Sequence, residues 1–176
     1  IVRTLSGRSD VSCLPDPTLL HSPEFYQVWV KRGRMNHADV FVYWLDWSDL
    51  RVANLACGRA RAHGGHRQIV ASAGYRVEDW LAAIAGAGLV LTNSFHGTVM
   101  ALLFHRPFVT LKLVDEMADM NERVQSLLTA VGLADRLILP DDVVNIDKAL
   151  ETPIDWEGVE SRLVGLRKAA ELTLTL

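Results

Sequence analysis

The sequence of 176 residues lacks several features that mark particular classes of protein. Its two cysteines, Cys13 and Cys57, have neither CxxC spacing nor the number that a disulfide framework needs, and they fit a reducing compartment such as the cytoplasm. No apolar run approaches the ~18 residues of a membrane-spanning helix. No polybasic segment is present, and 18 basic against 21 acidic residues give a net charge of −3. We therefore expect no nucleic-acid partner.

The chain also lacks an initiator methionine and a signal-peptide pattern at its start. We therefore expect it to begin inside a longer protein. Its length suits about one domain, and its 49% hydrophobic and 22% charged residues are typical of a globular fold. This composition excludes a disordered tail and a coiled coil.

The charges that are present are unevenly distributed. Residues 50–77 contain five arginines and no acid, whereas residues 113–176 contain 13 acidic and 6 basic residues. A basic segment can face an anionic ligand in a cleft, but from charge alone a solvated loop is the favoured interpretation.

Short apolar runs alternate with amphipathic segments along the chain. The runs predict strands at 38–45, 68–71, 89–92, 107–111 and 136–139. The amphipathic segments predict helices at 24–32, 77–85, 95–104, 121–131 and 155–172, and a helix capped by Ser48 or Asp49 that ends near Cys57, before a glycine-containing loop at 58–67. The alternation predicts an α/β fold, a Rossmann-like parallel sheet with helices on both faces.

The most informative turn is TNSFHGT at residues 92–98, between a predicted buried strand and a predicted helix. In such a sheet ligands bind at the carboxyl ends of the strands, and the free N–H groups of a helix start can hold an anion. Ser94, His96, Gly97 and Thr98 bring two hydroxyls, an imidazole and accessible backbone to this turn. The alternative is that Ser94 only caps the helix and His96 only hydrogen-bonds the loop.

Residues 77–111, which contain this turn, resemble the polysaccharide pyruvyl transferase family. Two further segments agree with the resemblance: LPDPTLL at 14–20 and NERVQSLLTAVGLADR at 121–136. The resemblance implies the C-terminal half of a GT-B-like two-domain fold. Residues 1–22 would then be the end of an N-terminal domain with its linker, and residues 23–176 the C-terminal Rossmann-like domain.

The resemblance also implies a reaction, the transfer of a pyruvyl group from phosphoenolpyruvate to a pair of sugar hydroxyls in exopolysaccharide or cell-wall glycan biosynthesis. We expect His96 to be the acid/base residue, with Ser94, Gly97 and Thr98 as substrate-binding residues. Many family members have an arginine where this chain has Ser94, so we expect the positive charge from Arg123 or Lys112 instead. Arg106 and His105 are expected at the opposite edge of the sheet, with His105 on the surface.

The expected partners are phosphoenolpyruvate, a saccharide acceptor and the missing N-terminal domain, with no cofactor. A lipid-linked acceptor would bring the protein from the cytoplasm to the inner face of the membrane. His63 and His66 have no apparent third ligand for a metal ion. Asp115, Glu116 and Asp119 fit a loop and the start of a helix, where negative charge is favourable. We therefore expect no metal.

Two other functions remain open at this point. One is a GT-B-type glycosyltransferase that holds the diphosphate of a nucleotide sugar at the helix start after Ser94. The other is a non-catalytic carbohydrate-binding domain. The tryptophans Trp44, Trp47 and Trp80 are expected to pack in or beside the core, with sugar stacking by Trp47 as the alternative.

Overall fold

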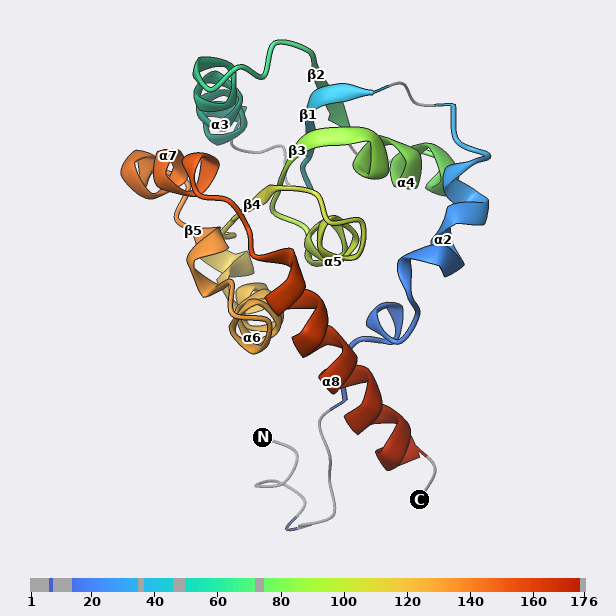
Figure 1. Ribbon diagram of the computed structural model, residues 1–176. Helices are drawn as coiled ribbons and strands as arrows, with labels where there is room; N and C mark the ends of the chain where they lie inside the picture. The colour runs from blue at the N-terminus through green and yellow to red at the C-terminus, as the bar shows by residue number, and fades with distance from the viewer. Residues whose placement is uncertain (1–6, 8–13, 35–36, 46–49, 72–74, 175–176) are drawn as a thin grey trace.

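The computed structural model describes residues 7, 14–34, 37–45, 50–71 and 75–174 (Figure 1). Within them, five parallel strands form one sheet in the order β2-β1-β3-β4-β5. The strands are β1 Ala38–Tyr43, β2 Gln68–Ala71, β3 Ala87–Thr92, β4 Phe108–Leu111 and β5 Leu137–Ile138. The predicted fold class, an α/β parallel sheet between helices, is confirmed. The strand order reverses between β1 and β3, and the carboxyl edge at such a switch point is where ligands bind in these sheets.

One helix precedes β1, others connect successive strands, and two follow the last strand. They are α2 Pro23–Val30, α3 Leu50–Ala62, α4 Val77–Gly86, α5 Phe95–Leu103, α6 Asn121–Ala130, α7 Val143–Glu151 and α8 Trp156–Leu174. Three short 3-10 helices add to them: η1 Pro17–Leu19, η2 Asp115–Met120 and η3 Ala134–Arg136. The predicted helices at 24–32, 77–85, 95–104, 121–131 and 155–172 are confirmed within a few residues.

Each face of the sheet packs its own core, because alternate side chains of a strand point to opposite faces. Phe41, Val90 and Phe108 pack with residues of α4, α5, α6 and α8. Val42 and Leu91 belong to a second core, which includes Ala60 of α3 and Ile146 of α7. Figure 1 shows α3 and α7 on one side of the sheet and α4 and α5 on the other. Helices on both faces explain why the strands read as continuous apolar runs.

Near the second core one prediction was wrong and one helix was missed. The helix expected to end near Cys57 continues to Ala62, so half of the predicted loop at 58–67 is helical. Ala60 is buried against the sheet, and this packing outweighs the helix-breaking tendency of Gly58. The proposed caps Ser48 and Asp49 lie outside the described residues.

The missed helix is α7. Asp142 caps it, since its carboxylate accepts a hydrogen bond from the backbone N–H of Asn145, and Ile146 and Ala149 are buried. An aspartate before an apolar periodic segment was the available signal.

The segment before α2 packs on the domain. Leu19 is buried in the larger core, the one that contains Phe41 and Phe108. Its carbonyl accepts a hydrogen bond from Arg167 Nε of α8 at 2.8 Å. The Tyr26 hydroxyl of α2 donates to the carbonyl of Thr18 at 2.8 Å. These contacts fix residues 16–20 beside the sheet. The boundary at residue 22 and the GT-B-like second domain stay predictions.

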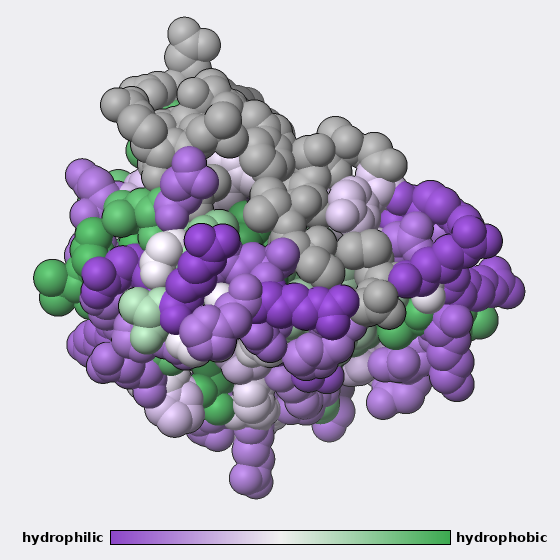
Figure 2. All heavy atoms as spheres, turned by 90° about the horizontal axis from the view of Figure 1, so that it is seen from above, coloured by the Kyte–Doolittle hydropathy of each residue, from purple (hydrophilic) through white to green (hydrophobic). Residues whose placement is uncertain are grey.

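The face seen from above in Figure 2 is mainly hydrophilic, with hydrophobic atoms gathered at the left edge, the side on which Figure 1 places α3 and α7. Among the described helices, none has the length and apolarity to cross a bilayer.

Candidate functional site

The turn between β3 and α5 lies at the carboxyl edge of the sheet, at the β1/β3 switch point. Two side chains of the turn tie the neighbouring strand ends together. Thr92 Oγ1 donates to the carbonyl of Tyr43 at 2.7 Å, and Asn93 Oδ1 accepts from the N–H of Leu45 at 2.9 Å. The predicted position of residues 92–98, opening a helix at this edge, is confirmed.

The hydroxyls of Ser94 and Thr98 are used within the turn. Ser94 Oγ accepts from the N–H of Gly97 at 3.3 Å and so caps α5. Thr98 Oγ1 donates to the Ser94 carbonyl at 3.0 Å and lies 2.7 Å from Thr110 Oγ1 of β4. Both residues are buried, at 4% and 0% exposed. They hold the turn in shape, and direct substrate binding by them stays a prediction.

Gly97 is required by helix–strand packing. A Cβ at this position would lie 2.6 Å from Thr92 Oγ1 and 3.2 Å from Thr92 Cβ. Only glycine lets α5 approach β3 this closely. Substrate binding by Gly97 stays a prediction, and the structure adds a packing reason for the glycine.

His96 faces the other way, outward from the first turn of α5. Its side chain is half exposed, and its Nε2 lies 3.9 Å from Asp16 Oδ2. The ring of Phe95 lies edge-on to it, with centroids 5.3 Å apart. The predicted acid/base residue is therefore open to a ligand beside a helix N-terminus.

Arg123 reaches the same place from α6. Its guanidinium donates to Asp16 Oδ2 at 3.0 Å and lies 4.2 Å above the Phe95 ring, a cation–π contact. Asn121 sets the start of α6, because its side chain exchanges two hydrogen bonds with the backbone of Leu113 just after β4. The structure thus brings Arg123 to the edge where His96 lies.

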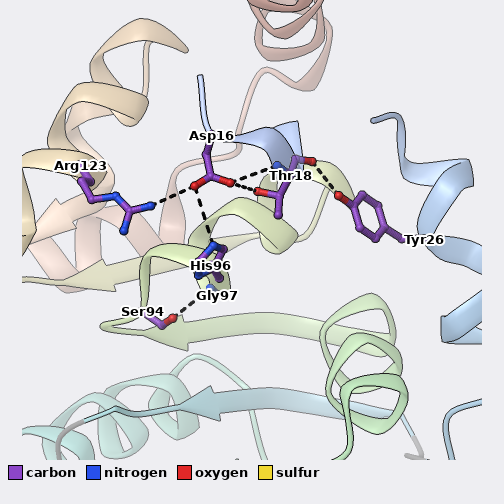
Figure 3. Close-up of polar contacts among 7 residues, drawn as sticks. All are labelled: Asp16, Thr18, Tyr26, Ser94, His96, Gly97 and Arg123. Carbon is purple, nitrogen blue, oxygen red and sulfur yellow. Dashed lines mark hydrogen bonds and ion pairs between the residues drawn. The ribbon is translucent and has the colours of Figure 1, made fainter. Parts of the chain in front are cut away.

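Asp16 joins these two side chains, as Figure 3 shows. Its other oxygen, Oδ1, accepts from the backbone N–H of Thr18 at 3.0 Å and from the Thr18 hydroxyl at 2.6 Å. Burial raises the pKa of the Asp16 carboxyl, but the hydrogen bonds from Thr18 and the charges of His96 and Arg123 outweigh it, so the pKa is lowered. Asp16 is therefore ionised at neutral pH. We call Asp16, His96 and Arg123 the outer cluster.

Sequence reasoning gave Asp16 no role, although it lies in the LPDPTLL segment. The available signal for Asp16 was its position in this family-like segment, between two prolines and just before the expected domain. Asn93 and Asn121 were also missed, because strand-end amides have no spacing signature.

An open pocket of about 540 Å³ borders the outer cluster. Asp16, Phe95 and Arg123 line it, together with apolar side chains of η1, α6 and α8 that include Leu127 and Leu166. The site therefore combines charged groups with an apolar wall, a combination common in small-molecule sites.

The other residues weighed for the site lie at both edges of the sheet. Lys112 follows β4 at the carboxyl edge, where its backbone N–H donates to the Ile138 carbonyl at 2.8 Å. His105 and Arg106 lie between α5 and β4, at the opposite edge as predicted. His105 is exposed and stacks on Trp156 with centroids 5.0 Å apart.

The remaining predictions have mixed outcomes. Trp44 is buried in the second core and Trp80 packs against the larger one, as predicted, whereas Trp47 lies outside the described residues. Arg59, in the basic segment, pairs with Asp147 of α7 and does not lie in a solvated loop. The described residues contain no group of three or more His, Cys, Asp or Glu that could hold a metal.

A doubly wound parallel sheet with a switch point between β1 and β3 defines a class of α/β proteins whose ligand sites lie at the carboxyl ends of the strands. Within that class, the model of the polysaccharide pyruvyl transferase family matches residues 3–113. This is more than half of the chain, and the chain belongs to that family. The family implies a transferase. No curated protein and no solved structure matches the chain.

The matched residues include Asp16 and the β3–α5 turn but end before Arg123. Two members of the outer cluster are thus inside the family match, and the third is placed by the fold.

Proposed function

We propose that this chain carries the phosphoenolpyruvate-binding part of an enzyme that transfers a pyruvyl group to two sugar hydroxyls as a ketal. The observation that carries the proposal is the outer cluster: His96 and Arg123 meet at one carboxylate at the switch-point edge. Phosphoenolpyruvate has a carboxylate and a phosphate, the groups that arginine and protonated histidine bind best. Family membership supports the transferase class of this reaction.

The reaction needs a proton donor and acceptor beside an anion site. A proton must reach C3 of phosphoenolpyruvate, which leaves cation-like character at C2. One sugar hydroxyl adds to C2 and loses its proton, and phosphate leaves with the electron pair of its bond to C2 and takes up a proton. The second hydroxyl then closes the ketal as its own proton is lost. His96 is half exposed and supplies and recovers these protons, whereas Arg123 binds the donor's anionic group.

The start of α5 adds to the attraction of an anion. The positive end of the helix dipole and the first N–H groups of the helix point to the carboxyl edge. Gly97 N–H is already used by the Ser94 hydroxyl. This leaves the outer cluster, beside the helix start, to hold the donor.

The acceptor side of the reaction is proposed on the family alone. We infer a saccharide acceptor in exopolysaccharide or cell-wall glycan synthesis. A lipid-linked acceptor would bring the enzyme from the cytoplasm to the inner face of the membrane. We propose no cofactor or metal, and we expect the second wall of the cleft from an N-terminal domain, so that this chain alone is inactive.

The test is phosphate release from phosphoenolpyruvate in the presence of sugar acceptors, measured on the protein with its expected N-terminal domain. His96→Ala should lower turnover about 10²–10⁴-fold, the usual effect of losing a general acid or base. His96→Asn keeps a hydrogen-bonding side chain but cannot transfer protons near neutral pH, so it should be nearly as damaging. His105→Asn, the same change at the opposite edge, should leave turnover unchanged.

Near-normal turnover in a folded His96→Asn protein would contradict the proton-transfer role. Nucleotide release from a nucleotide sugar, without phosphate release from phosphoenolpyruvate, would replace the proposal with a glycosyltransferase. Absence of turnover with either donor would favour a carbohydrate-binding domain.

A further inference from the structure

Asp16 occupies a position that is unusual for a structural carboxylate. One of its oxygens is fixed by the chain, because Oδ1 accepts two hydrogen bonds from Thr18. The other oxygen, Oδ2, faces Arg123 at 3.0 Å and His96 at 3.9 Å. The three side chains come from the N-cap of η1, from α5 and from α6, which are distant in sequence. The carboxylate is therefore held by its own segment and presented to two groups on other elements.

The accessibility of the three side chains differs in a way that bears on binding. The Asp16 side chain is only 15% exposed, whereas those of His96 and Arg123 are 51% and 56% exposed. An incoming ligand can thus reach the imidazole and the guanidinium from solvent while Asp16 stays behind them. A carboxylate that already bridges an imidazole and a guanidinium also shows that the pair can share one anionic group.

We propose that Asp16 is a positioning residue of this site: its carboxylate holds His96 and Arg123 facing one another and competes for them with the anionic group of the donor. The inference rests on the proposed function for the identity of that donor, phosphoenolpyruvate. Asp16 itself has no contact with the reacting atoms and acts through His96 and Arg123.

Two consequences of opposite sign follow from this arrangement. A fixed negative charge within a few ångströms of a bound anion opposes its binding, so removal of that charge strengthens binding. The same removal frees two exposed side chains, whose orientation then varies. A small misplacement of a catalytic group lowers the rate of the chemical step. Asp16 therefore weakens donor binding and speeds turnover.

Asp16→Asn separates these effects from the local fold. An asparagine oxygen can still accept the hydrogen bonds from Thr18, and asparagine is as good a cap as aspartate. The matched control is Asp39→Asn, which removes the same charge at the start of β1, on the amino edge of the sheet. Asp16→Ser, with a hydroxyl that can also cap, is the second variant in case the first one is unstable.

Binding is measured by calorimetric titration of the 176-residue chain with phosphoenolpyruvate and, separately, with inorganic phosphate. We expect Asp16→Asn to bind both ligands about threefold to tenfold more tightly than the unchanged chain, and Asp39→Asn to bind them equally well. Equal or weaker binding by Asp16→Asn would overturn the proposal.

Turnover is measured on the protein with its expected N-terminal domain. The kcat of Asp16→Asn should fall about tenfold or more, while KM for phosphoenolpyruvate does not rise. A raised KM with unchanged kcat would overturn the positioning role. If phosphoenolpyruvate supports no turnover at all but Asp16→Asn still binds phosphate more tightly, the proposed reaction fails and the competition of Asp16 for the anion stands.

Discussion

The two sides of the β3–α5 turn differ in what their side chains do. Toward the sheet, Ser94, Gly97 and Thr98 are buried and engaged with one another, with β3 or with β4. Toward solvent, His96 is half exposed and meets Arg123 at Asp16. One short motif thus contains residues that build the turn and a residue, His96, that faces solvent. Changes on the inner side should mainly affect stability, and changes in the outer cluster should mainly affect binding and turnover.

The largest effect on stability is expected at Gly97. In Gly97→Ala the new methyl group would lie 2.6 Å from Thr92 Oγ1, so α5 or β3 must move. We expect the free energy of unfolding to fall by about 2–3 kcal/mol, as for other overpacked cores. Urea unfolding followed by circular dichroism measures this loss.

Gly165→Ala in α8 is the matched control, because a Cβ there meets no atom within 4 Å. Alanine favours a helix over glycine, so this variant should gain up to ~1 kcal/mol. Equal stability of the two variants would contradict the packing reason for Gly97.

A smaller loss is expected for Thr98→Val, which keeps the shape of the side chain but removes its hydroxyl. The change deletes the contacts to the Ser94 carbonyl and to Thr110 Oγ1, both buried. We expect the free energy of unfolding to fall by about 1–2 kcal/mol and the affinity for phosphoenolpyruvate to stay unchanged. Thr173→Val, at an exposed position of α8, should change stability by less than about 0.5 kcal/mol. If the Thr98→Val chain is fully stable but binds phosphoenolpyruvate poorly, Thr98 acts in ligand binding and not in holding the turn.

The inner side of the turn could be predicted from the sequence better than the outer cluster. The apolar run 89–92 followed by Asn, Ser and Gly predicts a strand, a cap and a helix, because these preferences act between near neighbours. The meeting of Asp16, His96 and Arg123 depends on how η1 and α6 pack on the sheet, which no local pattern encodes. Similarly, α3 and α7 are stabilised by the burial of Ala60 and Ile146 in one core, which depends on tertiary packing. Local propensity around Gly58 indicated the opposite.

The smallest effect concerns the outer cluster and pH. The folded-state pKa of Asp16 is lowered below its ordinary value of 3.8, so its ionised form stabilises the fold. This stabilisation is fully present above the unfolded pKa and is lost as pH falls through the lower folded pKa. The free-energy advantage of the unchanged chain over Asp16→Asn should therefore shrink as the pH is lowered from about 5 into the acid range, by no more than ~1 kcal/mol.

Thermal or urea unfolding of both proteins across this range measures the difference. An advantage that is constant with pH would show that the ion pairs of Asp16 contribute nothing to stability.

The central claim, that the outer cluster is the anion-binding side of the turn, is tested most directly by one binding measurement. The affinity of the 176-residue chain for phosphoenolpyruvate is compared with that of Arg123→Gln and of Arg61→Gln, which loses the same charge on α3 at the far face of the sheet. Because Arg123→Gln loses a charge-assisted contact, we expect it to bind phosphoenolpyruvate about tenfold more weakly. Its free energy of unfolding should change by less than ~1 kcal/mol. The affinity of Arg61→Gln should equal that of the unchanged chain. Equal affinities of Arg123→Gln and the unchanged chain, or no binding by any of the three proteins, would contradict the account.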